Sequence, residues 1–152
     1  MTPITPIVVT LDFLEFPPDY TCKGDNRSPA LTIKNLTAQS LAIMVFNPFI
    51  KSCCSFSTWL IWNIPAMSRI PENFPKEPVP LSPVQAVQGK NDYGTIGYTG
   101  PCPPEGEMHR YQFRVYGLDI MLDLPPGSAK DDLIHAMKDH VTQYGETLAL
   151  AR

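Results

Sequence analysis

The sequence predicts a mostly β protein built in two layers, with long ordered loops and one helix. Seventeen prolines are more than long helices tolerate, because each proline fixes φ and removes a backbone donor. Several segments alternate β-branched and aromatic residues as strands do. One of them, residues 57–64, is apolar almost throughout, which is typical of a central strand covered on both faces. At 152 residues the chain is long enough for a hydrophobic core, and we expect a single domain over residues 1–152.

The strand pattern recurs along most of the chain. The predicted core strands are residues 7–13, 30–35, 40–47, 57–64 and 109–119. Residues 65–104 are too rich in proline for a regular ladder, so we expect a long ordered loop over the surface. Residues 144–152 alternate weakly and predict a short last strand.

The one predicted helix covers residues 128–141, "SAKDDLIHAMKDHV". Leu133, Met137 and Val141 repeat at every fourth position and form an apolar stripe, which we expect to pack on the core. Ser128 precedes Asp131 by three residues, a spacing that predicts a variant of the capping box at the start of the helix.

Composition and charge exclude several classes of partner. The net charge of -3 gives no electrostatic reason to expect nucleic acid or an anionic membrane surface. No segment approaches the roughly 20 consecutive apolar residues that a membrane span needs. The first residues have neither a basic segment nor a long apolar core, so we expect no targeting peptide and a cytoplasmic location.

The four cysteines are Cys22, Cys53, Cys54 and Cys102. No pair has the C-x-x-C spacing, and reduced thiols are the expected state in a cytoplasmic protein. For the adjacent Cys53 and Cys54, the alternative under oxidation is a vicinal disulfide. Nothing in the spacing supports a zinc site, and we expect neither a metal nor a cofactor.

Few residues point to catalysis. The sequence contains no G-x-S-x-G elbow and no phosphate-cradling glycine motif. His109 follows the proline-rich turn of residues 100–108 and begins a predicted strand. It is either a donor to a polar or anionic ligand in a cleft or a loop histidine satisfied by a backbone carbonyl, and the residues alone favour the second reading. Because a lone histidine has no positioned acid or nucleophile, we expect no enzyme.

Several sequence blocks together resemble a known family. The chain is similar to the phosphatidylethanolamine-binding protein family, especially its bacterial Raf-kinase-inhibitor-like branch, and the similarity covers most of the sequence. The blocks are "FPPDYTCKGDNRSPAL", "WLIWNIP", "GKNDYGTIGYTGPCPPEGEMHRYQFRVYGLD" and "LDLPPGSAKDDLIHAMKDHV". The resemblance implies an antiparallel Greek-key β-sandwich with one or two flanking helices.

The resemblance also implies a small pocket that accepts phosphate-like anions and phospholipid head groups. In the family the proline-rich turn forms one wall of this pocket, and the histidine and tyrosine of "HRY" reach into it. His109 and Tyr111 thereby become the expected ligand donors, with Gly100 and Pro101 as the wall.

The chain departs from the family pattern at three positions. The two acids of an Asp-Pro-Asp signature fall on Asn47 and Phe49, and a histidine before the "WLVWN"-like strand falls on Thr58. An asparagine amide donates a hydrogen bond at any pH, whereas threonine removes a charge-assisted bond of about 1.5 to 3 kcal/mol. We therefore expect Asn47 and Thr58 to leave a pocket with weaker or altered anion preference and less dependence on pH.

The resemblance and these departures from it lead to two alternative functions. The first is a small-ligand binding protein for phosphate-like anions or phospholipid head groups. The second is a protein-interaction module that modulates a kinase or protease without binding small anions.

Overall fold

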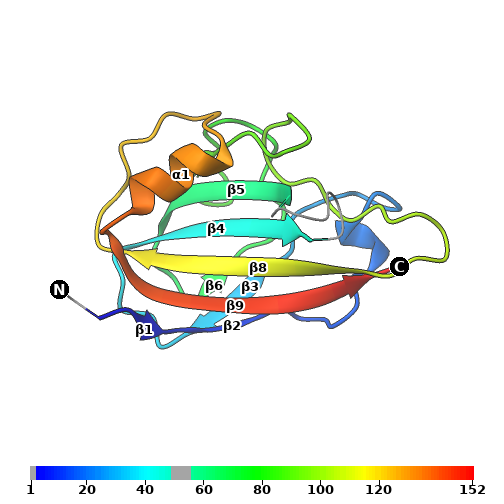
Figure 1. Ribbon diagram of the computed structural model, residues 1–152, viewed down its shortest axis with the longest axis horizontal. Coiled ribbons are helices and arrows are strands. Elements are labelled where there is room, and N and C mark those ends of the chain that lie inside the picture. Colours follow the sequence, from blue (N-terminus) through cyan, green and yellow to red (C-terminus); the bar gives the residue numbers. More distant parts are fainter. Residues whose placement is uncertain (1–2, 49–55) are drawn as a thin grey trace.

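The long strands arise where the alternating apolar segments were predicted, and they build two sheets (Figure 1). The computed structural model describes residues 3–48 and 56–152. The strands are β1 (Thr5–Pro6), β2 (Val8–Thr10), β3 (Leu31–Lys34), β4 (Ser40–Asn47), β5 (Phe56–Pro65), β6 (Arg69–Ile70), β7 (Val87–Gln88), β8 (His109–Leu118) and β9 (Val141–Ala151). The helices within the described residues are the 3-10 helix η1 (Pro18–Tyr20) and the α-helix α1 (Lys130–Met137).

The larger sheet has the strand order β1-β9-β8-β4-β5-β7, and the smaller sheet has the order β2-β3-β6. The succession β8-β4-β5-β7 is that of a Greek key, because the fourth strand of the series returns to lie beside the first. Every strand pair is antiparallel except β1 with β9, which is parallel. The larger sheet is therefore mixed at one edge, where the chain passes beside β9 before it enters the smaller sheet.

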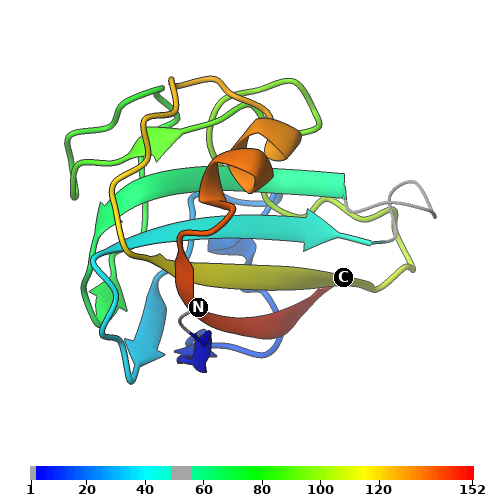
Figure 2. The ribbon, with the colours of Figure 1, turned by 60° about the vertical axis from the view of Figure 1, so that its left-hand side comes forward.

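The larger sheet lies between two apolar layers. Figure 2 shows α1 in front of one face of this sheet. One cluster of buried residues fills the space between the two sheets, and a second packs under α1. All eight residues of β4 are buried, and β5 is buried over nearly its whole length. This confirms that the nearly continuous apolar run at residues 57–64 is a central strand with both faces covered.

The helix is shorter than predicted, and its capping differs. Ser128 does not cap it, because the Ser128 hydroxyl donates to the Pro125 carbonyl over 2.6 Å in the preceding turn. The box is shifted by one residue: the Asp132 carboxylate accepts a hydrogen bond from the backbone amide of Ala129 at 3.0 Å. Leu133 and Met137 are buried as the apolar stripe predicts.

The last strand is longer than predicted. Strand β9 begins at Val141 and pairs with β8 from Leu118↔Val141 to His109↔Ala151. Its own alternation is weak because several of its side chains are only partly buried, so the pairing with β8 rather than its apolar pattern sets its length. Residues 65–104 form the expected ordered loop, interrupted by the two-residue strands β6 and β7.

The expectation of reduced thiols is wrong for two of the cysteines. Cys22 and Cys102 form a disulfide across a sequence separation of 80 residues, with their Cα atoms 5.4 Å apart. The pairing joins two loops that meet only in the folded chain, so cysteine spacing carried no signal for it. Cys53 and Cys54 lie outside the described residues. Within the described residues, no helix has the length and apolar character that crossing a membrane requires.

Candidate anion-binding site

The predicted site lies at the end of the larger sheet where β4 ends and β8 begins (Figure 1). Asn47 is the last residue of β4 and His109 is the first residue of β8. The two strands are antiparallel neighbours, so these residues meet at the same end. Tyr111 follows two residues after His109, and residues two apart in a strand point to the same face.

Three side chains form a buried hydrogen-bonded cluster. The Asn47 amide Nδ2 donates to the Tyr111 hydroxyl over 2.9 Å and lies 3.3 Å from His109 Nδ1. Asn47 is fully buried, and Tyr111 and His109 are 2% and 8% exposed. Because Nδ2 carries only donor hydrogens, His109 Nδ1 accepts from it, and the ring proton lies on Nε2. The structure therefore brings together three of the six predicted site residues.

Glu107 is the partner of the other His109 nitrogen. The distance between His109 Nε2 and Glu107 Oε1 is 2.9 Å. The side chain of Glu107 is 55% exposed, whereas that of His109 is 11% exposed. Sequence reasoning missed this residue, although its position two residues before His109 in an extended segment was an available signal.

Among the described residues, the Tyr111 hydroxyl accepts a hydrogen bond and donates none. Burial raises the pKa of Tyr111, and nearby Tyr93 adds to this effect, while hydrogen bonds from Asn47 and the Cys102 backbone oppose it. The hydroxyl oxygen accepts from Asn47. No acceptor for its proton is found in the described part of the chain.

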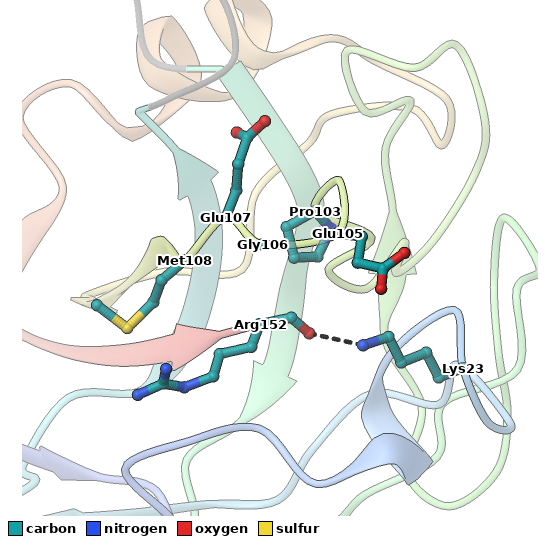
Figure 3. Close-up of a pocket in the computed structure, with 7 residues that line it drawn as sticks. All are labelled: Lys23, Pro103, Glu105, Gly106, Glu107, Met108 and Arg152. Carbon is teal, nitrogen blue, oxygen red and sulfur yellow. Dashed lines mark hydrogen bonds between the residues drawn. The ribbon is translucent and has the colours of Figure 1, made fainter.

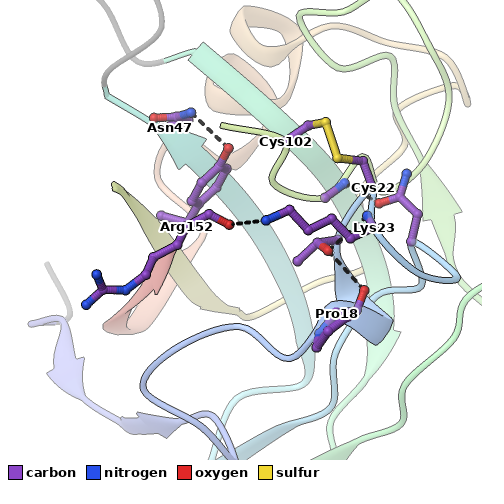
Figure 4. Close-up of a disulfide and its surroundings, with 10 residues drawn as sticks. Pro18, Cys22, Lys23, Asn47, Cys102 and Arg152 are labelled. Carbon is purple, nitrogen blue, oxygen red and sulfur yellow. Dashed lines mark hydrogen bonds between the residues drawn. A yellow bond between two sulfur atoms is a disulfide. The ribbon is translucent and has the colours of Figure 1, made fainter. Parts of the chain in front are cut away.

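The predicted wall, Gly100 and Pro101, is held against the loop that follows η1. The Gly100 amide donates to Asn26 Oδ1 over 2.7 Å, and the Pro101 carbonyl accepts from the Cys22 amide over 3.1 Å. Cys102, the residue after Pro101, forms a disulfide with Cys22, and this bond fixes the same contact between the two loops covalently. Figure 4 shows the disulfide and Asn47 at the same end of the sheet.

Only glycine fits at the start of this wall. A Cβ atom on Gly100 would lie 2.2 Å from the Tyr20 carbonyl oxygen and 2.5 Å from Asn26 Oδ1. Both distances are far below a van der Waals contact, and the first involves backbone that has no rotamer to change. The close approach of two loops therefore requires the absence of a side chain at Gly100.

Thr58 does not join the buried cluster. Its side chain is buried, and its hydroxyl donates to the Val45 carbonyl at 3.4 Å rather than to Asn47, His109 or Tyr111. The Thr58 carbonyl accepts from the amide of Thr99 at 3.0 Å, directly before Gly100. Thr58 thus supports the wall through its backbone.

An open hollow adjoins the cluster through Glu107 (Figure 3). It has a volume of about 460 Å³ and is lined by Lys23, Pro103, Glu105, Gly106, Glu107, Met108 and Arg152. Across it, the Lys23 ammonium donates to the Arg152 carbonyl over 2.9 Å. A larger hollow of about 840 Å³ lies beside α1 and the start of β9, and it is lined by none of the predicted site residues.

Metal binding finds no support in this geometry. Cys22 and Cys102 are bonded to each other, so neither is available as a thiolate ligand beside His109. The described residues contain no group of three or more histidine, cysteine or acidic side chains arranged to hold a metal ion.

Comparison with known proteins agrees with the class that the fold and the site define, a β-sandwich binding protein. The family described as "Phosphatidylethanolamine-binding protein" matches residues 10–150. The chain belongs to this family, and the resemblance found in the sequence is confirmed.

Relatives in sequence and in structure cover nearly the same range. A UPF0098 protein of Pyrococcus horikoshii is 44% identical over 137 residues, which are 88% of this chain and 69% of that protein. A UPF0098 protein of Methanothermobacter thermautotrophicus is also 44% identical, over 90% of this chain and 89% of its own.

Two crystal structures share the fold. One is a putative phosphatidylethanolamine-binding protein homologue of Chlamydia trachomatis, with a TM-score of 0.82 and 28% identity over 97% of this chain and 98% of that one. The other is E. coli YbcL, described as a new member of the mammalian family, with a TM-score of 0.83 and 26% identity over 96% and 98% of the two chains. The predicted fold class is confirmed, and the family fold supports a role in ligand binding or interaction.

Proposed function

We propose that this protein binds a phosphate-like anion, either free or as part of a phospholipid head group, at Asn47, His109 and Tyr111. The hydrogen bond from Asn47 Nδ2 to the Tyr111 oxygen carries the proposal. Since that oxygen accepts from Asn47, the Tyr111 hydroxyl proton is directed to another acceptor. An anionic oxygen at this end of the sheet is the acceptor that it suits best, because hydrogen bonds to charged groups are the stronger ones.

The remaining predicted residues have distinct roles in this proposal. His109 supplies the second donor from Nε2, on the side of the ring opposite Asn47. Gly100 and Pro101 form the wall, and Thr58 holds that wall through its carbonyl. The proposed donor set is therefore one hydroxyl and one ring N–H, with the Asn47 amide orienting both.

Two groups of the proposed site, the Asn47 amide and the Tyr111 hydroxyl, add little pH dependence to the affinity for an anion. The Asn47 amide has no titration near neutrality. Burial raises the pKa of Tyr111 above its usual range, so the hydroxyl keeps its proton well past neutral pH. We expect a flatter pH profile of anion affinity than a site with a carboxylate at position 47 would give.

A protein-interaction role is the second candidate, and the hollow beside Glu107 favours it. Lys23, Glu105, Glu107 and Arg152 place charges of both signs around this hollow. Paired charges of this kind suit polar side chains of a protein partner such as a kinase or protease. In this alternative no small anion binds, and the loop surface around the site holds the partner.

Calorimetric titration with inorganic phosphate and with phosphoethanolamine separates the two roles. We expect saturable millimolar binding by the wild type and by the control H135A, whose histidine lies on α1. H109A should bind at least about tenfold more weakly, the equivalent of one charge-assisted hydrogen bond. Undiminished binding by H109A would overturn the proposed site, and no binding by the wild type would favour the interaction role.

We also infer a non-enzymatic role, because the cluster of Asn47, His109 and Tyr111 pairs no nucleophile with a base.

The cytoplasmic location stays a prediction, and the Cys22–Cys102 disulfide bears on it, since such bonds are rare in most reducing compartments and common in hyperthermophiles. Fractionation of cells of the source organism, with thiol labelling of the protein in each fraction, tests both the location and the oxidation state.

A further inference from the structure

Glu107 places a carboxylate where an anion bound to His109 would lie. We propose that Glu107 is an internal competitor for the site: its carboxylate holds the His109 Nε2 donor in the unliganded protein, and an incoming anion must displace it. This inference rests on the proposed anion-binding function and names a residue that sets the affinity of that site.

The contact between the two side chains has the geometry of an occupied anion site. Glu107 Oε1 lies 2.9 Å from His109 Nε2, within the range of a charge-assisted hydrogen bond. The hydrogen bond of Asn47 to Nδ1 fixes the ring tautomer, so the Nε2 proton points at Glu107. A phosphate oxygen would accept the same proton with the same geometry.

The two partners differ in their freedom to move. His109 is held inside the cluster and its side chain is 11% exposed, whereas the Glu107 side chain is 55% exposed. Glu107 therefore can leave while His109 stays in place. The adjoining hollow of about 460 Å³, which Glu107 lines, gives the displaced side chain room (Figure 3).

The backbone before Glu107 keeps the carboxylate close to its partner. The Glu107 amide donates to the Pro104 carbonyl over 3.0 Å, which closes a turn at Gly106. Gly106 has a φ of 85°, a conformation that favours glycine. An anion tethered two residues from its partner has a high effective concentration, so a free ligand competes at a disadvantage.

The solvent exposure of Glu107 limits how much its carboxylate lowers the affinity for phosphate. A hydrogen bond to a carboxylate that lies largely in solvent is weak, and its removal changes an equilibrium by a modest factor. We therefore expect loss of the Glu107 carboxylate to tighten phosphate binding by about three- to tenfold. A residue that only supported the fold of the site would weaken binding when it is replaced, so the direction of the change is diagnostic.

The experiment compares E107Q and E107A with the control E105Q by calorimetric titration with inorganic phosphate. Glu105 lies on the same turn, lines the same hollow and forms no hydrogen bond or ion pair with any described residue. E105Q thus reproduces the change in net charge without the contact to His109. Thermal unfolding of each variant checks that the fold is retained.

The inference predicts tighter binding by both Glu107 variants and a change of less than about twofold in E105Q. In the wild type, the Glu107 carboxyl carbon signal should shift in proportion to phosphate saturation, as the side chain leaves His109. Equal tightening in E105Q, or weaker binding in E107Q and E107A, would overturn the role of Glu107 and leave the site itself standing. Absence of phosphate binding in the wild type and every variant would instead overturn the proposed function.

Discussion

The side-chain amide of Asn47, at the end of β4, donates a hydrogen bond to the hydroxyl oxygen of Tyr111 on β8 over 2.9 Å. An aspartate at this position would reverse the bond, because a carboxylate accepts and the tyrosine would have to donate. Whether position 47 carries a carboxylate or an amide therefore decides where the Tyr111 proton points. With asparagine present, that proton has no acceptor among the described residues, and we propose that a ligand provides one.

Replacing Asn47 by aspartate tests this consequence. In N47D the Tyr111 proton turns to the new carboxylate, which also repels an anion, so phosphate affinity should fall by about tenfold near neutral pH. Affinity should recover as the pH falls and the carboxylate is protonated. Titration of N47D at several pH values, beside the exposed control N35D, measures both effects.

The double variant with Asn47→Asp and Thr58→His extends the test. It introduces one titrating acid and one titrating base beside the cluster, so its affinity for phosphate should depend on pH more steeply than that of the wild type. An unchanged affinity and an unchanged pH profile in this double variant would contradict the role given to the two departures from the family pattern.

The disulfide should contribute strongly to stability. It closes a loop over a separation of 80 residues, and loss of such a bond costs typically about 2 to 4 kcal/mol. C22S, C102S and the double serine variant should all unfold about 5 to 15 °C below the oxidised wild type in calorimetry. The single and double variants should agree, since each lacks the bond. A melting temperature equal to that of the wild type would mean that the bond adds no stability.

The same calorimetry tests the domain organisation. We propose that residues 1–152 form one domain, and a single domain of this size should unfold in one cooperative transition with equal calorimetric and van't Hoff enthalpies. Two separate transitions in the oxidised wild type would argue for independent units.

Gly100→Ala should damage the wall of the site. The added methyl group would meet the Tyr20 carbonyl oxygen at 2.2 Å, and the two loops must separate to relieve this contact. We expect a loss of more than about 2 kcal/mol in the free energy of unfolding, together with weaker phosphate binding. The control is Gly94→Ala, where no atom lies within 4 Å but φ is 86°, so a loss of about 1 kcal/mol is expected. Chemical denaturation of both variants compares the two costs, and equal losses would contradict the steric account.

The fold was predictable where a segment's own pattern decides its structure. Strand β4 occupies the predicted residues 40–47 because its side chains are buried on both faces of the sheet. The two-residue strands β1, β6 and β7 were missed because their partners define them, and a run so short has no detectable alternation. The length of β9 was underestimated for a related reason, since pairing with β8 rather than burial extends it.

The candidate site was predictable only in part. The family resemblance predicted that Asn47, His109 and Tyr111 lie together, and the structure places them in one hydrogen-bonded cluster. The contact of Glu107 with His109 depends on how the proline-rich turn closes. The Cys22–Cys102 bond likewise depends on two loops meeting in space. The spacing of two residues between Glu107 and His109 was the one signal for the first contact. The disulfide has no signature in local sequence.

Asp92 gives the stability of the protein a dependence on acid pH. Burial tends to raise the pKa of Asp92, but the Ser57 amide at 2.8 Å and the Lys130 ammonium at 3.0 Å outweigh it, so the pKa is lowered. A carboxyl whose pKa is lower in the folded state stabilises the fold above the unfolded value of 3.8. That stabilisation is lost as the pH falls through the folded value.

D92N should therefore be less stable than the wild type by about 1 kcal/mol at neutral pH, and the difference should vanish in strong acid. Urea denaturation of both proteins between neutral pH and about pH 2 measures this convergence. The control is D123N, because Asp123 is exposed and forms no hydrogen bond with the described residues. A constant difference between D92N and the wild type at all pH values would show that the charge of Asp92 is not the cause.

The most direct test of the proposed anion site is an NMR titration of the wild type with inorganic phosphate and then with phosphoethanolamine. The ring of His109 and the amide of Gly100 report on the donor and on the wall. We expect saturable shifts of both signals at two pH values, with affinities that vary less with pH than those of N47D, because the Asn47 amide does not titrate. No shift of either signal at tens of millimolar ligand would overturn the proposed site and would direct the search to protein partners.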